Sequence, residues 1–252
     1  MFREEELLFV TTTLNTKWLD KQQSIIKNMF PNALSLIVDG KNNWPNVWFS
    51  WIKELKKYTG IKWVIHIDED CFIINRDEFV KVIDNMTNNN IDVCGVPDGN
   101  HPYRGANPVA INTFLMIVNY DKLLSIESSL KLDTLQFGYH HTNGWLNSHN
   151  IYFDKNYISK FSYKFEPFGN GANFNFEQEP YYYLMWCMLN NGFKFDYLYP
   201  HFDDTYKSTN PRIAENTPDI AIHMWYVREW QSNMDVHGVR NCERYSLLEK
   251  KL

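Results

Sequence analysis

Short apolar runs alternate with helical patterns over the first two-fifths of the chain. Three of these runs, Leu7–Val10, Ala33–Val38 and Trp63–Ile67, have the length and composition of buried β-strands. Between them lie two segments with apolar residues at helical spacing, Thr16–Met29 and Asn46–Tyr58. Strands joined by helices of this length form parallel crossover units, not hairpins. The order therefore predicts an α/β fold with a Rossmann-like, mostly parallel central sheet flanked by helices.

The rest of the chain continues the pattern and contains no linker that would divide it. Further strands are expected at 91–96, 112–118, 193–198 and 221–226, and further helices at 77–86, 120–130, 180–191 and in the tail from residue 242. The segment 132–160 is aromatic and loop-like. The segment 202–218 is polar, contains two prolines and is expected to be a mobile loop. Residues 1–252 are therefore expected to form a single domain.

Composition excludes several classes of protein. Apolar residues make up 44% of the 252 residues, as in a globular chain, and the net charge of −5 gives no indication of a nucleic-acid partner. No apolar run is long enough to cross a bilayer, and the acidic segment Met1–Glu6 does not resemble a signal peptide. A cytoplasmic protein, or a piece of a larger one, is expected. The four cysteines are scattered without a C-x-x-C pair, so a zinc site or disulfide framework is not expected.

Three consecutive acids follow the buried strand Trp63–Ile67 directly. In an extended segment, Asp68 and Asp70 project to the same side, so both can reach one metal ion. Ligands of open α/β sheets bind beyond the carboxyl ends of the strands, where these acids lie. Magnesium and manganese are commonly held by one or two carboxylates and by substrate phosphates. The pattern therefore favours a site for a metal ion and a diphosphate. The alternative is that these acids lie in the first turn of a helix, where the helix dipole favours negative charge.

Four segments, in this order, give the chain a resemblance to the GT-A glycosyltransferases, which transfer sugars from nucleotide-sugar donors by means of a D-x-D metal motif. Leu8–Thr13 is similar to the first strand and the loop that holds the nucleotide, and Ile67–Asp70 is similar to the D-x-D segment. Asn112–Asn119 resembles the asparagine-led strand that retaining members place beside the donor sugar. Ile220–Trp225 resembles the late strand whose histidine completes the metal site. The order of the four segments, rather than any one of them, is specific.

The resemblance implies a Mn²⁺-dependent enzyme of the hexosyltransferase type, with Mg²⁺ as the other possible ion. Its donor would be a nucleotide-sugar, UDP-linked rather than GDP-linked, and its acceptor a hydroxyl of a glycan or glycoconjugate. The metal ligands would be Asp68, Asp70 and His223, with Asp68 and Asn112 also near the donor. An imidazole suits manganese better than magnesium, which prefers oxygen ligands. On residue type alone, His223 is at least as well explained as an ordinary histidine near the end of an apolar strand.

A second pair of acids, Glu177 and Glu179, precedes the expected helix at 180–191. Acids at a helix start often only complement the helix dipole. The resemblance implies instead that one of them, Glu179 rather than Glu177, faces the reacting carbon. It would be the general base of an inverting enzyme, or a nucleophile or electrostatic stabiliser in a retaining one. The two stereochemical courses stay open, because the asparagine-led strand favours retention and the helix favours inversion.

Further residues are candidates for binding the nucleotide. Thr11, Thr12 and Asp39, at the ends of the first two strands, would bind the base and ribose, with ordinary loop chemistry as the alternative. The basic candidates for the donor or its diphosphate are Arg104, Arg228 and Lys207. An exposed surface charge is the simpler interpretation of each of these three. The resemblance also implies a nucleotide-binding half (1–119), an acceptor half (120–230) and a C-terminal tail (231–252).

Three other functions compete with sugar transfer. A nucleotidyltransferase would carry a Gly-rich, basic loop after the first strand, where this chain has Thr11–Asn15. A metal-dependent hydrolase could use His66 with Asp68 and Asp70, although no second histidine motif supports it. A non-catalytic sugar-binding domain would keep the fold without the reaction. In a transferase, the segment 202–218 would close over the donor and exclude water.

Overall fold

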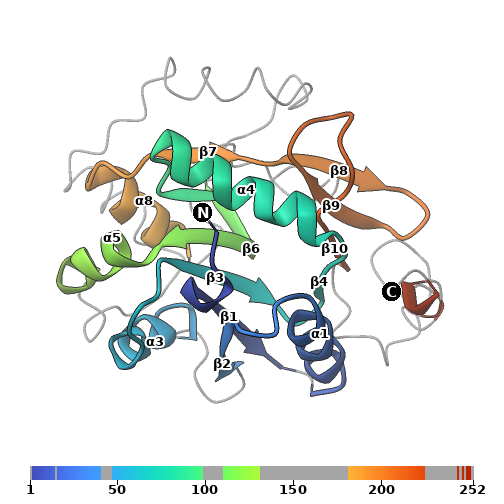
Figure 1. Ribbon diagram of the computed structural model, residues 1–252, viewed down its shortest axis with the longest axis horizontal. Helices are drawn as coiled ribbons and strands as arrows, with labels where there is room; N and C mark the ends of the chain where they lie inside the picture. Colours follow the sequence, from blue (N-terminus) through green and yellow to red (C-terminus); the bar gives the residue numbers. More distant parts are fainter. Residues whose placement is uncertain are drawn as a thin grey trace.

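The computed structural model describes residues 2–14, 16–40, 47–98, 110–130 and 181–224, with a few positions of the C-terminal segment (243, 246 and 248–250). Its first half alternates strands and helices as the sequence predicts (Figure 1). The elements in this part are β1 (Leu7–Thr13), α1 (Thr16–Met29), β2 (Leu34–Asp39), α3 (Val47–Glu54) and β3 (Trp63–Asp68), with short 3-10 turns at Glu4–Glu6 and Leu55–Lys57.

The rest of the described chain contains the expected strands and three strands that the sequence did not predict. The elements are β4 (Cys71–Ile73), α4 (Arg76–Asn89), β5 (Val93–Pro97), β6 (Ile111–Asn119), α5 (Tyr120–Ser125), a 3-10 helix (Glu127–Leu130), α8 (Tyr182–Asn190), β7 (Phe195–Tyr197), β8 (Tyr199–Asp203), β9 (Ser208–Arg212) and β10 (Ala221–His223). The strands β5, β6, β7 and β10 were expected, and β4, β8 and β9 were not predicted. None of the described helices combines the length and the apolar character needed to cross a bilayer.

The central sheet has six strands in the order β2-β1-β3-β6-β5-β7. Five of them run in one direction and only β6 runs against them, which confirms the predicted α/β fold with a mostly parallel sheet. The register aligns Thr12 of β1 with Val38 on one side and Asp68 on the other. The carboxyl ends of the first three strands therefore meet at one edge, as expected for a ligand-binding edge.

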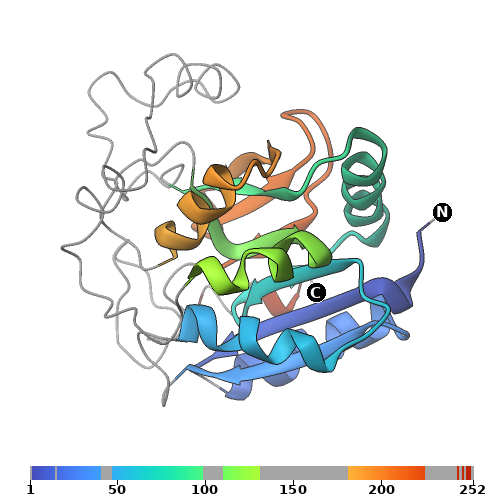
Figure 2. The ribbon, with the colours of Figure 1, turned by 90° about the vertical axis from the view of Figure 1, so that its left-hand side faces the viewer.

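Helices cover both faces of this sheet. Those on one face, α3, α5 and α8, enclose a core that includes Val10, Val64 and Met116, and they lie together in Figure 2. Those on the other face, α1 and α4, enclose a second core that includes Phe9 and Ile65. Burial on both faces explains why β1, β3 and β6 are continuous apolar runs in the sequence instead of alternating patterns.

A second sheet, antiparallel and four-stranded in the order β4-β10-β9-β8, extends from the end of β3. The expectation of a mobile loop at 202–218 is wrong, because β8 and β9 form a hairpin there. Ser208 and Asn210 of β9 are buried, and both have partners: Ser208 donates to Asn210 over 2.9 Å, and Asn210 donates to Asp219 over 2.8 Å. The hairpin is therefore part of the folded scaffold and not a lid.

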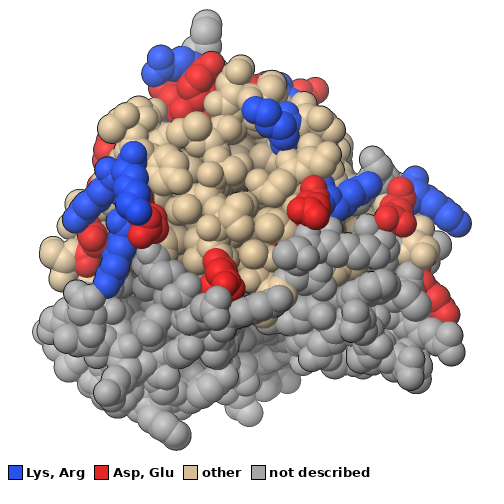
Figure 3. Space-filling view, turned by 90° about the horizontal axis from the view of Figure 1, so that it is seen from below, with Lys and Arg blue, Asp and Glu red and all other residues tan. Residues whose placement is uncertain are grey.

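The edge strand β2 is the most open part of the central sheet. Leu34 and Ile37 of this strand are each 42% exposed. Seen from below in Figure 3, the described surface has a broad central area without charged side chains, and lysine, arginine, aspartate and glutamate lie around its margin.

Candidate metal centre

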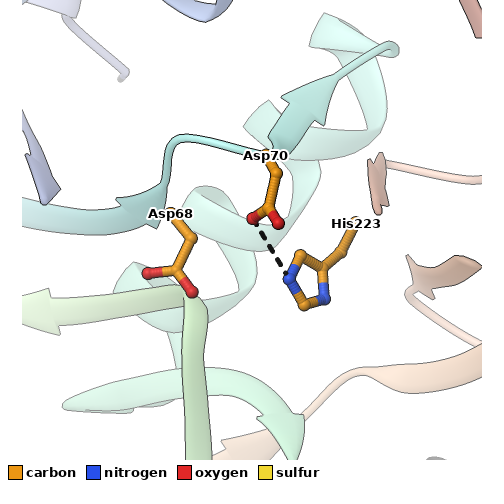
Figure 4. Close-up of side chains that lie close together, drawn as sticks. All are labelled: Asp68, Asp70 and His223. Carbon is orange, nitrogen blue, oxygen red and sulfur yellow. Dashed lines mark ion pairs between the residues drawn. The ribbon is translucent and has the colours of Figure 1, made fainter. Parts of the chain in front are cut away.

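The turn after β3 and the end of β10 bring together three side chains that could hold a metal ion (Figure 4). Asp68 is the last residue of β3, and Asp70 precedes β4. Strand pairing aligns His223 with Cys71, and the Met224 N–H donates to the Asp70 carbonyl over 2.9 Å. The backbone ladder of the second sheet therefore fixes His223 beside the turn.

The donor atoms of these three residues fit one divalent ion. One ligand atom from each of Asp68, Asp70 and His223 lies within 4.8 Å of the others, and Nε2 of His223 is 3.4 Å from Oδ1 of Asp70. Octahedral metal–ligand bonds of about 2.1 Å place neighbouring donors about 3 Å apart and opposite donors about 4 Å apart. Two carboxylates and one imidazole therefore need only small shifts to bind an ion together, and the imidazole favours a transition metal over magnesium.

The plane of the histidine ring is set by β6. Phe114, which is fully buried, stacks on His223 with a centroid distance of 4.1 Å and an interplanar angle of 10°. Flat stacking on a rigid aromatic ring restricts rotation of the imidazole about its Cβ–Cγ bond. A ligand held in one orientation loses less entropy when it binds a metal.

A buried glutamine of α1 holds the backbone of the metal turn. Gln22 is fully buried, and its Nε2 donates to the carbonyls of Asp68 and Cys71, the latter over 3.2 Å. Its Oε1 accepts a hydrogen bond from Thr11 Oγ1 over 3.0 Å. Sequence reasoning missed this residue, although the signal was present: Trp18, Gln22 and Ile26 follow one another at a spacing of four on the buried side of the helix.

The glutamate between the two aspartates bonds outside the metal centre. Oε2 of Glu69 accepts from the Thr13 hydroxyl and, over 2.9 Å, from the Leu14 N–H. It thus holds the β1–α1 loop against the metal turn.

The predicted nucleotide-binding threonines differ in their surroundings. Thr11 is fully buried and its hydroxyl contacts Gln22 and Gln23 of α1, so its side chain supports the fold. Thr12 is half-buried beside Asp68 at the edge of the sheet, and Asp39 is exposed at the end of β2. Of the three, Thr12 and Asp39 lie where a ligand could reach them.

The predicted donor-sugar residue Asn112 has a partner that sequence reasoning did not identify. Its Nδ2 donates to Oδ1 of Asp98 over 2.7 Å, and its Oδ1 accepts from the Phe114 N–H over 3.1 Å. Both Asp98 and Asn112 are buried. Because Phe114 also stacks on His223, this pair is connected to the metal centre through one residue.

His66 has no place among the metal ligands. It is fully buried, and its Nδ1 donates to the Thr113 carbonyl over 2.7 Å, while its ring lies 5.6 Å from that of Trp51. Burial lowers the pKa of His66 to about 4, and the hydrogen bond to Thr113 opposes this only in part. The residue is a neutral core histidine, and it does not join the ligand cluster of Asp68.

Four of the predicted site residues, Arg104, Glu177, Glu179 and Arg228, lie outside the described residues. Lys207 is described and lies in the turn between β8 and β9, where it pairs with Asp204. Cys71, Cys94 and Cys187 are buried.

No family model matches the sequence, and no curated protein matches it. Solved structures similar to the chain include a glycosyltransferase involved in the glycosylation of the major capsid of PBCV-1, at 16% identity and a TM-score of 0.41, with 63% of this chain and 74% of that chain covered. Another is the mannosyltransferase PcManGT from Pyrobaculum calidifontis in complex with GDP-Man and Mn²⁺, at 10% identity and a TM-score of 0.36, with 48% and 46% covered. A third is the galactosyltransferase LgtC in complex with donor and acceptor sugar analogs, at 9% identity and a TM-score of 0.44, with 97% and 95% covered. The proposed function rests on the residues of the candidate metal centre and not on these distant structural similarities.

Proposed function

We propose that the protein is a metal-dependent glycosyltransferase of the GT-A type. It would move a sugar from a nucleoside diphosphate sugar, UDP-linked rather than GDP-linked, to a hydroxyl of a glycan or other acceptor. The observation that carries the proposal is the convergence of Asp68, Asp70 and His223 at the edge where the parallel strands end. A hydrolase that uses His66 is not favoured, because that side chain is buried and neutral.

The proposed ion is Mn²⁺, bound by Asp68, Asp70 and His223. When bound, it would neutralise the charge that grows on the nucleoside diphosphate as the sugar–phosphate bond breaks. The protein's own residues supply the positioning. Phe114 fixes the plane of the imidazole, and Gln22 fixes the carbonyls on both sides of the turn.

The remaining assignments follow from location. Thr12 and Asp39 would contact the nucleoside, because they lie at the strand ends beside the metal turn. Asn112, held by Asp98, would orient the donor sugar. We also propose Glu179 or Glu177 as the catalytic carboxylate and Arg104 and Arg228 as donor contacts, with donor binding in residues 1–119 and acceptor binding in 120–230.

The test is the variant Asp70→Ala. We expect it to lose both sugar transfer and the Mn²⁺-dependent part of UDP binding, measured by turnover of a nucleotide-sugar panel and by calorimetry with and without Mn²⁺. Asp84→Ala, which removes an exposed carboxylate of α4, is the matched control and should behave as the wild type. If Asp70→Ala keeps both properties, the proposal is wrong.

The same calorimetry separates the competing functions. A non-catalytic sugar-binding domain should bind sugars without needing metal, and a hydrolase should show no preference for the nucleotide. NMR of the product anomer assigns retention or inversion once a donor is turned over.

A further inference from the structure

Glu69 directly connects the metal turn to the β1–α1 loop. Its backbone lies between Asp68 and Asp70, while its carboxylate accepts hydrogen bonds from Thr13, the last residue of β1, and from Leu14, the first residue of the loop. The path from the metal ligands to the Leu14 N–H therefore consists of a single residue. Two rigid parts joined through one side chain are expected to influence one another's motion.

Burying a third carboxylate at Glu69, beside Asp68 and Asp70, costs free energy. Glu69 is only 6% exposed and adjoins two other carboxylates, so both desolvation and like-charge repulsion act against it. Hydrogen bonds to a charged carboxylate offset part of that cost. Thr13 and Leu14 thus provide the hydrogen-bond donors that stabilise the buried carboxylate of Glu69, and this carboxylate in turn holds the two residues in place.

The loop is enclosed from the other side as well. A Cβ at Gly40, just after β2, would lie 3.0 Å from both the Thr13 carbonyl oxygen and the Leu14 side chain. The register also pairs Thr13 with Asp39. Thr13 and Leu14 therefore lie between the end of β2 and the metal turn, next to the residues proposed above for the nucleoside.

The far side of the turn is fixed independently. Gln22 holds the carbonyls of Asp68 and Cys71 from α1, and the β10 backbone holds that of Asp70. With these supports in place, the Glu69 side chain connects the turn to Thr13 and Leu14. A metal ion that relieves the repulsion between Asp68 and Asp70 would steady the backbone of Glu69 and, with it, the hydrogen bond to Leu14.

We propose that Glu69 is a positioning residue that transmits metal binding to Thr13 and Leu14 at the end of β1, so that an occupied metal centre orders these two residues beside the nucleotide. This inference rests on the metal centre of the proposed function. It concerns a contact made by the carboxylate oxygen and not the negative charge. Glutamine, whose side-chain oxygen can accept the same two hydrogen bonds, should therefore replace glutamate, and leucine should not.

The test measures amide hydrogen exchange of the peptide containing Leu14, with and without Mn²⁺ and in the absence of any nucleotide. Mn²⁺ binding is measured separately by electron paramagnetic resonance. We expect Mn²⁺ to slow exchange in this peptide at least about fivefold in the wild type and in Glu69→Gln, a factor at the low end of ordinary coupling between sites. In Glu69→Leu, Mn²⁺ should still bind but leave the exchange unchanged. Thr13→Val, which removes one of the two donors, should give an intermediate effect and serves as the second variant if Glu69→Leu does not fold.

Glu78→Leu is the matched control. Glu78 is also 6% exposed, but its carboxylate pairs with Lys81 of α4 and not with the loop, so the Mn²⁺ effect should equal that of the wild type. The inference is overturned if Mn²⁺ binds to the wild type without slowing the Leu14 peptide, or if Glu69→Leu keeps the full effect. If the wild type binds no Mn²⁺ at all, the proposed metal centre is wrong, and the proposed coupling through Glu69 is then wrong as well.

Discussion

Nε2 of His223 lies 3.4 Å from Oδ1 of Asp70, although the two residues come from distant parts of the chain. Their approach results from backbone pairing, since β10 aligns with β4 and the Met224 N–H bonds to the Asp70 carbonyl. Ligands carried by paired strands are held more firmly than ligands carried by loops. The second, four-stranded sheet thus places a histidine beside the acidic turn that follows β3 of the central sheet.

The histidine should decide which metal is preferred. In His223→Gln, an amide oxygen replaces the imidazole nitrogen, and oxygen ligands suit magnesium better than transition metals. We expect Mn²⁺ affinity to fall at least about tenfold while Mg²⁺ affinity changes less, so that the ratio of the two dissociation constants moves toward Mg²⁺. Competition titrations give this ratio. His201→Gln, a change of a partly exposed histidine on β8, should leave the ratio as it is, and an unchanged ratio in His223→Gln would contradict the assignment.

The stacked phenylalanine should affect the metal through the histidine. Phe114→Leu preserves most of the buried volume but removes the flat surface against which His223 lies. We expect a loss of about 1 kcal/mol in the free energy of unfolding and a several-fold loss in Mn²⁺ affinity. Phe79→Leu, on the buried side of α4, should cost similar stability without changing Mn²⁺ affinity. Equal metal affinities in the two variants would show that the ring does not orient the ligand.

Gln22 should support both the fold and the metal turn. Gln22→Met fits the same space but leaves the carbonyls of Asp68 and Cys71 and the hydroxyl of Thr11 without this partner. Buried polar groups that lose a partner cost about 1–3 kcal/mol each, so the free energy of unfolding should fall by several kcal/mol. Urea titration measures the loss. Gln23→Met should cost less, because that side chain is only half-buried; equal losses would mean that Gln22 does not hold the turn.

The sequence predicted the central sheet because its signals are local. The strands β1 to β3 are apolar runs separated by amphipathic helices, and such patterns depend only on neighbouring residues. The β8–β9 hairpin was missed because its stability is not local: buried Ser208 and Asn210 appear as loop residues until Asp219 is seen beside them. β4, at three residues, is too short to give a pattern.

The same distinction applies to the candidate site. Asp68 and Asp70 were predicted from their place at the end of a strand, and His223 required the resemblance to a family. Gln22 and Asp98 were missed, because each matters only through a contact with a residue distant in the sequence. The bonds from Glu69 to the β1–α1 loop likewise join positions about 55 residues apart.

His66 should make the stability of the fold depend on pH. Burial lowers its pKa to about 4 in the folded protein, against 6.5 in the unfolded chain, so the unfolded state binds the proton more readily between these values. Stability should therefore be complete above pH 6.5 and fall as the pH drops toward 4, by on the order of 3 kcal/mol from this residue. His66→Asn keeps a donor toward the Thr113 carbonyl but does not titrate. Its unfolding free energy should lie below that of the wild type at pH 7.5, and the difference should shrink as the pH falls to 4. A difference that stays constant in urea titrations across this range would contradict the burial of a neutral imidazole.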